Sequence, residues 1–117
     1  MSRLIVFEPD LLFSSRIESA AAKVGFSAKV FDNLDEFLQE AKQSTPQVAL
    51  VNLDVAVGKF AVLEGLARSS SCKVVGYYSH VNSSLAEEAQ RTGINAVFPR
   101  GAFANKLEAL LREFSSG

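Results

Sequence analysis

The stretch PQVALVNLD, residues 46–54, places an amide and a carboxylate where an apolar run ends. Asn52 and Asp54 are two residues apart, and strand side chains alternate with period 2, so either one could point to the same face. A carboxylate there can act as a nucleophile or bind a cation, whereas an amide is a poor nucleophile. The function of the chain therefore depends on which of the two occupies the reactive position.

Polar side chains follow three other apolar runs, in the stretches Glu8-Pro9-Asp10, Tyr78-Ser79-His80 and Pro99-Arg100-Gly101. Glu8, Asp10 and Asp54 are weak candidates for a magnesium site, because Mg²⁺ prefers oxygen ligands. The single His80 and the single Cys72 are too few for a zinc cluster and give no evident serine–histidine–acid or cysteine–histidine arrangement. We therefore expect no metal, no cofactor and no enzymatic activity.

The composition excludes several classes of function. The chain has 117 residues, 48% of them hydrophobic and 21% charged, which predicts a single globular domain over residues 1–117. The net charge is -1 and the basic residues are scattered, so no basic stripe indicates nucleic-acid binding. No apolar run approaches the roughly 20 residues of a membrane span, and the lone Cys72 suits a reducing compartment, so we expect a cytoplasmic protein.

Five apolar runs predict the strands of a sheet. They are continuous and rich in β-branched and aromatic residues, which indicates strands buried on both faces. The runs are Leu4–Phe7, Ala28–Phe31, Val48–Leu53, Val74–Tyr78 and Ala96–Phe98.

Helical periodicity near 3.6 separates these runs and predicts five helices. The first ends at Gly25, the second follows the N-cap candidates Asp32 and Asn33, and the fourth spans residues 83–92 before Gly93. The apolar stripes are Phe13, Ile17, Ala20, Ala21 and Val24; Leu34, Phe37, Leu38 and Ala41; Val62, Leu63 and Leu66; Leu85, Ala86 and Ala89; and Phe103, Leu107, Leu110, Leu111 and Phe114. The alternation predicts an α/β fold, a five-stranded parallel sheet with helices on both faces and its functional crevice at the carboxyl ends of the strands.

The order and spacing of these elements resemble the receiver domain of two-component response regulators over essentially the whole chain. RLIVFEPDLLFSSRIESAAAKVGF is similar to the first strand and helix of that family, and PQVALVNLD to its third strand. KVVGYYSH resembles the fourth strand, and GINAVFPRGAF the fifth strand with the turn into the last helix. The resemblance implies a CheY-like, flavodoxin-like (βα)5 fold and a role in phosphorelay signal transduction.

The resemblance also implies a phosphoryl-transfer site, and this chain departs from it at each position. An active receiver has an acidic pair that binds Mg²⁺, an acceptor Asp, a Ser or Thr, and a Lys. The corresponding residues are Glu8 and Pro9, Asn52, Tyr78 and Arg100, with Val97 at the position of an aromatic switch residue. Asn52 is assigned to the acceptor position because it stands six residues after Pro46, the usual spacing in the family.

We therefore predict a degenerate receiver, or pseudo-receiver, which is not phosphorylated in the usual way and acts by binding protein partners in a signalling pathway. Asn52 would hold the acceptor pocket in a fixed neutral state, or would only cap backbone groups at the strand end. A partner or a second copy of the chain would bind the face of the fourth helix, fifth strand and fifth helix. The charged residues of that face are Glu87, Glu88, Arg91, Lys106, Glu108 and Arg112.

Two alternative functions stay open. A shift of the third strand by two residues would make Asp54 the phosphoryl acceptor, with Mg²⁺ held by Glu8 or Asp10 and with Arg100 close by. The third hypothesis is a small-molecule site in the crevice, against which the bulk of Tyr78 and Phe98 argues.

Three further expectations concern the strand ends and the end of the chain. We expect the hydroxyls of Tyr77 and Tyr78 to reach the surface and His80 to lie in a solvated loop. The sequence stops at Ser115-Ser116-Gly117, directly after the last expected helix. It is compatible with a stand-alone receiver and with a piece of a longer protein.

Overall fold

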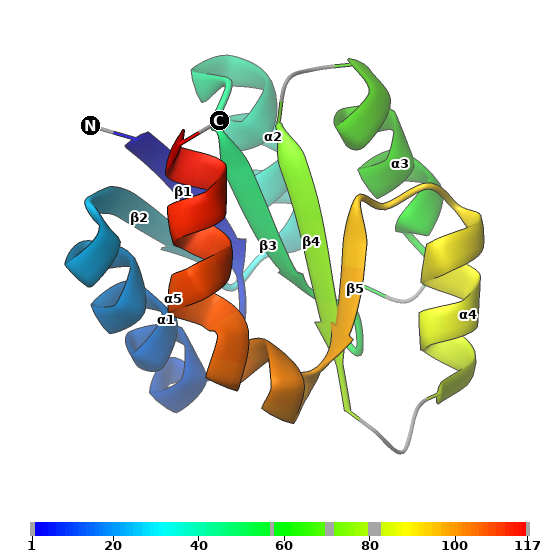
Figure 1. Ribbon diagram of the computed structural model, residues 1–117. Coiled ribbons are helices and arrows are strands. Elements are labelled where there is room, and N and C mark those ends of the chain that lie inside the picture. The colour runs from blue at the N-terminus through cyan, green and yellow to red at the C-terminus, as the bar shows by residue number, and fades with distance from the viewer. Residues whose placement is uncertain (1, 57, 70–71, 80–82, 117) are drawn as a thin grey trace.

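The computed structural model describes residues 2–56, 58–69, 72–79 and 83–116 and contains a five-stranded parallel sheet (Figure 1). The strands are β1 (Ser2–Phe7), β2 (Phe26–Phe31), β3 (Val48–Asn52), β4 (Lys73–Tyr78) and β5 (Ala96–Pro99). The helices are α1 (Leu11–Val24), α2 (Leu34–Ser44), α3 (Phe60–Ser69), α4 (Ser83–Arg91) and α5 (Arg100–Ser116). The strand order is β2-β1-β3-β4-β5, so the predicted doubly covered α/β fold is confirmed.

The helices form a layer on each face of the sheet (Figure 1). On one face, α1 and α5 pack side chains such as Ile17 and Leu107 against Val6, Leu50 and Val75 of the central strands. On the other face, α2, α3 and α4 cover the sheet.

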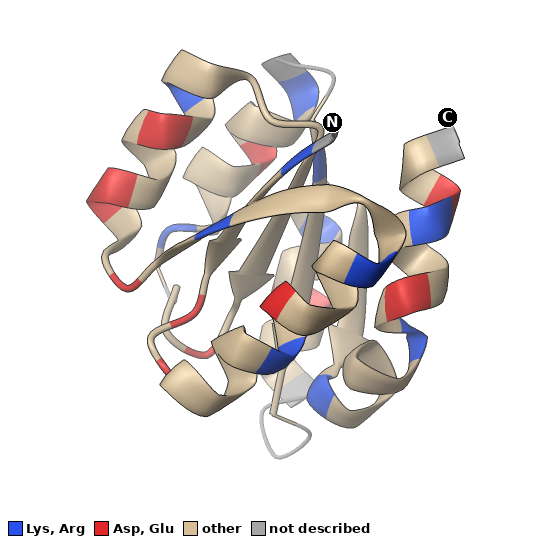
Figure 2. Ribbon diagram, turned by 90° about the vertical axis from the view of Figure 1, so that its left-hand side faces the viewer, with Lys and Arg blue, Asp and Glu red and all other residues tan. Residues whose placement is uncertain are grey.

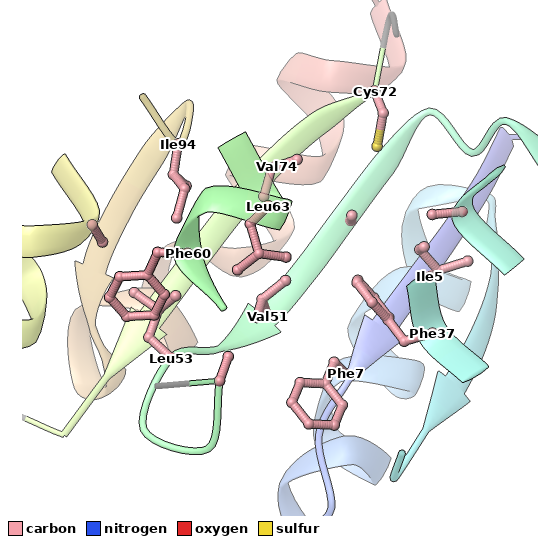
Figure 3. Packing of buried hydrophobic residues seen from close by; sticks show 14 residues of the cluster. Ile5, Phe7, Phe37, Val51, Leu53, Phe60, Leu63, Cys72, Val74 and Ile94 are labelled. Atoms are coloured by element: carbon pink, nitrogen blue, oxygen red, sulfur yellow. The ribbon is translucent and has the colours of Figure 1, made fainter. Parts of the chain in front are cut away.

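The core on the second face is built from aromatic and branched side chains. Leu63 of α3 lies next to Val51 of β3, and Phe37 of α2 lies beside Phe7 of β1 (Figure 3). Phe60 lies beside Leu53 in the same view. Because β1, β3 and β4 are covered on both sides, their near-continuous burial explains why their sequences do not alternate.

The starts of α1 and α2 are fixed by side-chain caps. Asp10 accepts a hydrogen bond from the Leu12 N–H at 3.0 Å, and Asn33 accepts one from the Glu36 N–H at 3.0 Å. Such caps satisfy backbone donors that the first helical turn leaves without partners. The α1 helix ends at Gly25, whose φ of +89° is favourable for glycine. The Asp10 carboxylate therefore caps α1 at the end of the sheet where the candidate site lies.

Some predicted boundaries and one core position were wrong. Strand β2 begins at Phe26, two residues before the predicted start, and β3 ends at Asn52, so Leu53 lies in the following turn. The side chain of Val62 is 44% exposed, although it was assigned to the buried stripe of α3. Phe60 and Leu63 supply the buried face instead, because the helix begins at Phe60 and positions three residues apart share a face.

Gly76 in β4 is required by the side chain of Leu53. A Cβ at this position would lie 2.7–2.9 Å from three atoms of Leu53, which is itself fully buried. Gly76→Ala should therefore lower the free energy of unfolding by about 1–3 kcal/mol in a urea titration, the usual cost of overpacking. Gly65→Ala in α3 is the control, since a Cβ there meets nothing within 4 Å and alanine favours the helix. Equal stabilities of the two variants would contradict the close contact.

Candidate functional site

Three buried polar side chains from adjacent strands meet at the carboxyl end of the sheet. Asn52, the last residue of β3, is paired in register with Tyr77 of β4. Glu8 follows Phe7, which is paired with Val51 on the other side of β3. Glu8, Asn52 and Tyr77 are 2%, 7% and 1% exposed, respectively. The parallel register thus brings together groups that are 44 and 69 residues apart in the chain.

The Glu8 carboxylate accepts hydrogen bonds from three neutral donor groups. The Asn52 Nδ2 donates to both Oε1 and Oε2 at 3.1 Å, and the Tyr77 hydroxyl donates to Oε1 at 2.7 Å. The Asp10 N–H donates to Oε2 at 3.0 Å. A carboxylate has about four lone-pair positions, so each is directed to a protein donor. These hydrogen bonds stabilise the buried carboxylate.

Asn52 is also fixed at its carbonyl end. Its Oδ1 accepts a hydrogen bond from the Asp54 N–H at 2.9 Å, which closes a local turn after β3. The amide therefore caps backbone and binds Glu8 at the same time. A role of Asn52 in holding the acceptor pocket in a fixed neutral state stays a prediction.

Asp54 lies in the turn beyond β3 and is half-buried. Its Oδ2 accepts a hydrogen bond from the Ser79 N–H at 3.0 Å, which joins the β3–α3 turn to the end of β4.

Among the described residues, no group of three or more His, Cys, Asp and Glu side chains is arranged to hold a metal ion.

Arg100 is held at the start of α5 by contacts with α1. Its Nη2 lies 3.3 Å from Asp10 Oδ2, and its Cζ lies 4.1 Å from the centroid of the Phe13 ring. Because both side chains of this ion pair are about half exposed, it contributes little to stability by itself. The cation is nevertheless positioned beside Phe13 and the N-cap of α1.

Tyr77 is the site residue that the sequence did not reveal, and the prediction that its hydroxyl reaches the surface was wrong. Its ring stacks on Phe103 at 4.3 Å between centroids and lies 5.3 Å from Phe13. Burial, followed by the hydrogen bond to Glu8, raises the pKa of Tyr77, so the hydroxyl remains a donor. Tyr78 points to the opposite face, where it is half-buried against the core beneath α2, α3 and α4.

The predicted partner-binding face carries charges of both signs. Most of its selected residues are exposed, namely Glu87, Glu88, Arg91, Lys106 and Arg112. Glu108 is half-buried and pairs with Arg112 at 3.7 Å, while the Lys106 ammonium lies 5.7 Å from the Phe98 ring centroid. Acidic and basic residues are likewise mixed along the helices in Figure 2. A role of this face in partner binding stays a prediction.

The remaining predicted residues are placed as follows. Pro9 is exposed, Val97 is half-buried against the core beneath α2, α3 and α4, and His80 lies outside the described residues.

A hollow of about 890 Å³ lies at the amino-terminal end of the sheet, lined in part by Gln47 and Lys73. It is at the wrong end of the sheet for the predicted small-molecule crevice.

Comparisons with known proteins identify the fold. No protein-family model matches the chain, and no curated protein matches it in sequence. A response regulator from Thermotoga maritima is similar in structure, with a TM-score of 0.83 at 13% identity, covering 100% of this chain and 99% of that chain. A response regulator from Hahella chejuensis has a TM-score of 0.82 at 13% identity, covering 97% of this chain and 95% of that chain. A protein provisionally named as the pilus assembly protein CpaE from Burkholderia thailandensis gives 0.75 at 16% identity, with 100% of both chains covered.

The chain therefore has the fold of response regulator receiver domains, as its sequence pattern predicted. In the described part of the chain, no helix combines the length and apolarity needed to cross a membrane.

Proposed function

We propose that the chain is a degenerate receiver, a protein-interaction module of a signalling pathway that works without phosphorylation. The observation that carries this proposal is the hydrogen bonding of Asn52 to Glu8 at the carboxyl end of the sheet. A neutral amide stands at the end of β3, and the neighbouring Glu8 carboxylate already accepts hydrogen bonds from protein donors. The state of the module is then set by partner binding.

The chemistry of phosphoryl transfer supports this proposal. Transfer requires a nucleophilic oxygen and a metal ion that neutralises the developing charge. The Asn52 amide supplies neither a nucleophile nor a negative charge. For Glu8 to bind Mg²⁺, the donors from Asn52 and Tyr77 would have to leave it, and those buried groups would lose their partner.

The contacts of Asp54 favour a structural role for this residue. Its carboxylate accepts the Ser79 N–H, and its own N–H is bound by Asn52. Both hydrogen bonds order the loops at the rim of the site. Phosphorylation of Asp54 is therefore the alternative outcome of the test that follows.

The test is an amide NMR titration with Mg²⁺ and beryllofluoride, a mimic of the phosphoryl group. We expect no Mg²⁺-dependent shift of the resonances of Glu8, Asn52 and Asp54 at millimolar ligand, because in the described part of the chain no three His, Cys, Asp or Glu side chains are grouped to hold a metal ion. Incubation with acetyl phosphate should add no phosphoryl mass to the intact protein.

A Mg²⁺-dependent, saturable shift around Glu8, Asp54 and Arg100 would overturn the proposal. In that case Asp54→Asn should abolish the response, whereas Asp35→Asn on the exposed side of α2 should leave it unchanged. The same comparison by mass spectrometry would identify the phosphorylated residue.

A further inference from the structure

A hollow beside Arg100 is lined by residues of α1 and α5 and by Ser79 at the end of β4. Its volume is about 390 Å³, and its lining residues are Phe13, Arg16, Ser79, Arg100, Gly101 and Ala104. None of the hydrogen-bonded side chains of Glu8 and Asn52 lines it. The hollow is thus a separate feature of the same edge of the sheet.

The charges at this hollow are predominantly positive. The guanidinium carbons of Arg16 and Arg100 lie 5.9 Å and 4.1 Å from the centroid of the same ring, that of Phe13. Arg100 is paired with Asp10, but within the described part of the chain Arg16 has no carboxylate within ion-pair distance. No acidic residue is among the lining residues, so the hollow carries an excess of positive charge.

Hydrogen-bond donors accompany this charge. Ser79 lines the hollow, and among the described residues its one hydrogen bond is donated by its backbone N–H to Asp54, which leaves its hydroxyl available as a donor. A guanidinium has five N–H donors, so Arg100 can keep its contact with Asp10 and still donate to a ligand. The first turn of α5, which begins at Arg100, contains no acidic residue that would oppose an anion.

We propose that this hollow binds a phosphate-type anion, either inorganic phosphate or the phosphorylated serine or threonine side chain of a partner protein. Two guanidinium groups lie near the same aromatic ring, and arginine can donate paired hydrogen bonds to a phosphate-type anion. The Ser79 hydroxyl is a further potential donor among the lining residues. The binding requires neither Mg²⁺ nor an acceptor carboxylate.

The proposal is tested by titrating inorganic phosphate into the protein in EDTA and following the arginine side-chain N–H and Ser79 amide resonances. We expect saturable shifts in the native chain and at least about tenfold weaker binding in Arg16→Gln, since hydrogen bonds to charged groups are strong. Lys23→Gln is the matched control, because it removes the same charge from the same helix at a position that does not line the hollow. Its binding should stay within about twofold of the native value at physiological salt.

Two results would overturn the proposal. One is the absence of saturation, and the other is an equal loss in Arg16→Gln and Lys23→Gln, which would show a diffuse attraction to the basic side chains of α1. Arg16 and Lys23 are both exposed, so neither variant should fail to fold.

The source of the phosphate group is assigned by comparing ligands. A short phosphoserine peptide that binds more tightly than inorganic phosphate, while its unphosphorylated form does not bind, assigns a modified partner protein. Equal affinity for the peptide and inorganic phosphate assigns the free anion. Loss of this binding leaves the proposed function intact, whereas Mg²⁺-dependent modification of Asp54 would overturn the proposed function and leave Arg16 and Arg100 at this hollow.

Discussion

Replacing Asn52 with aspartate is expected to destabilise the protein at neutral pH and to make its stability depend on Mg²⁺. The substitution removes the Nδ2 donor that binds both oxygens of Glu8 and places a second carboxylate against it. Leaving a buried charge without its partner and adding a like charge should lower the free energy of unfolding by about 3–5 kcal/mol. A divalent cation bound between the two carboxylates would offset this loss.

The pH dependence of the Asn52→Asp variant follows from the same repulsion. Burial beside a carboxylate raises the pKa of the introduced carboxyl in the folded state above about 3.9, its usual value. Above that value the folded state binds more protons than the unfolded state, so stability decreases as the pH rises. The variant should therefore lose stability relative to the native chain between about pH 4 and the raised pKa of the new carboxyl.

The measurement is urea unfolding at pH 5 and at neutral pH, with and without millimolar Mg²⁺. Asn33→Asp is the matched control, because Asn33 caps α2 from an exposed position and aspartate caps helices equally well. It should show neither the loss nor the Mg²⁺ dependence. If Asn52→Asp were as stable as the native chain at neutral pH without Mg²⁺, the buried contact with Glu8 would be refuted.

The placement of these side chains at the strand ends followed from strand periodicity together with the resemblance to receiver domains. A run such as Val48–Asn52 is apolar throughout because helices cover both faces of the sheet, and its first polar side chain marks the carboxyl end. Since β1 and β3 are adjacent in a parallel sheet, Glu8 and Asn52 had to come close together. The identity of the groups and their position were therefore predictable.

The hydrogen-bond and ion-pair partners of these groups could not be predicted, because they depend on how far each side chain extends, which the order of residues does not show. Tyr77 belongs to the face under α1 and α5, yet its long ring carries the hydroxyl up to Glu8 at the strand ends. Two adjacent tyrosines at the end of the apolar run of β4 were the available signal. The pairing of Arg100 with Asp10 depends on where α1 and α5 begin, and element boundaries are the weakest part of a sequence-based prediction.

Tyr77→Phe is expected to lower the free energy of unfolding by about 1–3 kcal/mol, although the ring that packs on Phe103 is retained. The cause is the lost hydrogen bond to Glu8, whose buried charge would be one donor short. Tyr78→Phe is the control at neutral pH: Tyr78 is only half-buried and has no side-chain hydrogen bond within the described residues, so its change should stay within about 0.5 kcal/mol. Similar effects of the two variants would contradict a structural role for the Tyr77 hydroxyl.

The stabilising effect of the Tyr77 hydroxyl should decline in alkaline solution. Burial and the hydrogen bond to Glu8 raise the pKa of Tyr77 in the folded state. In the unfolded chain the tyrosine has its ordinary pKa of about 10. The stabilisation is thus complete below about pH 10 and is lost above it, by about 1.4 kcal/mol per pH unit. The difference in stability between the native chain and Tyr77→Phe should narrow accordingly in urea titrations above pH 10. A constant difference would mean that the hydroxyl ionises equally in both states, which a buried donor to a carboxylate cannot do.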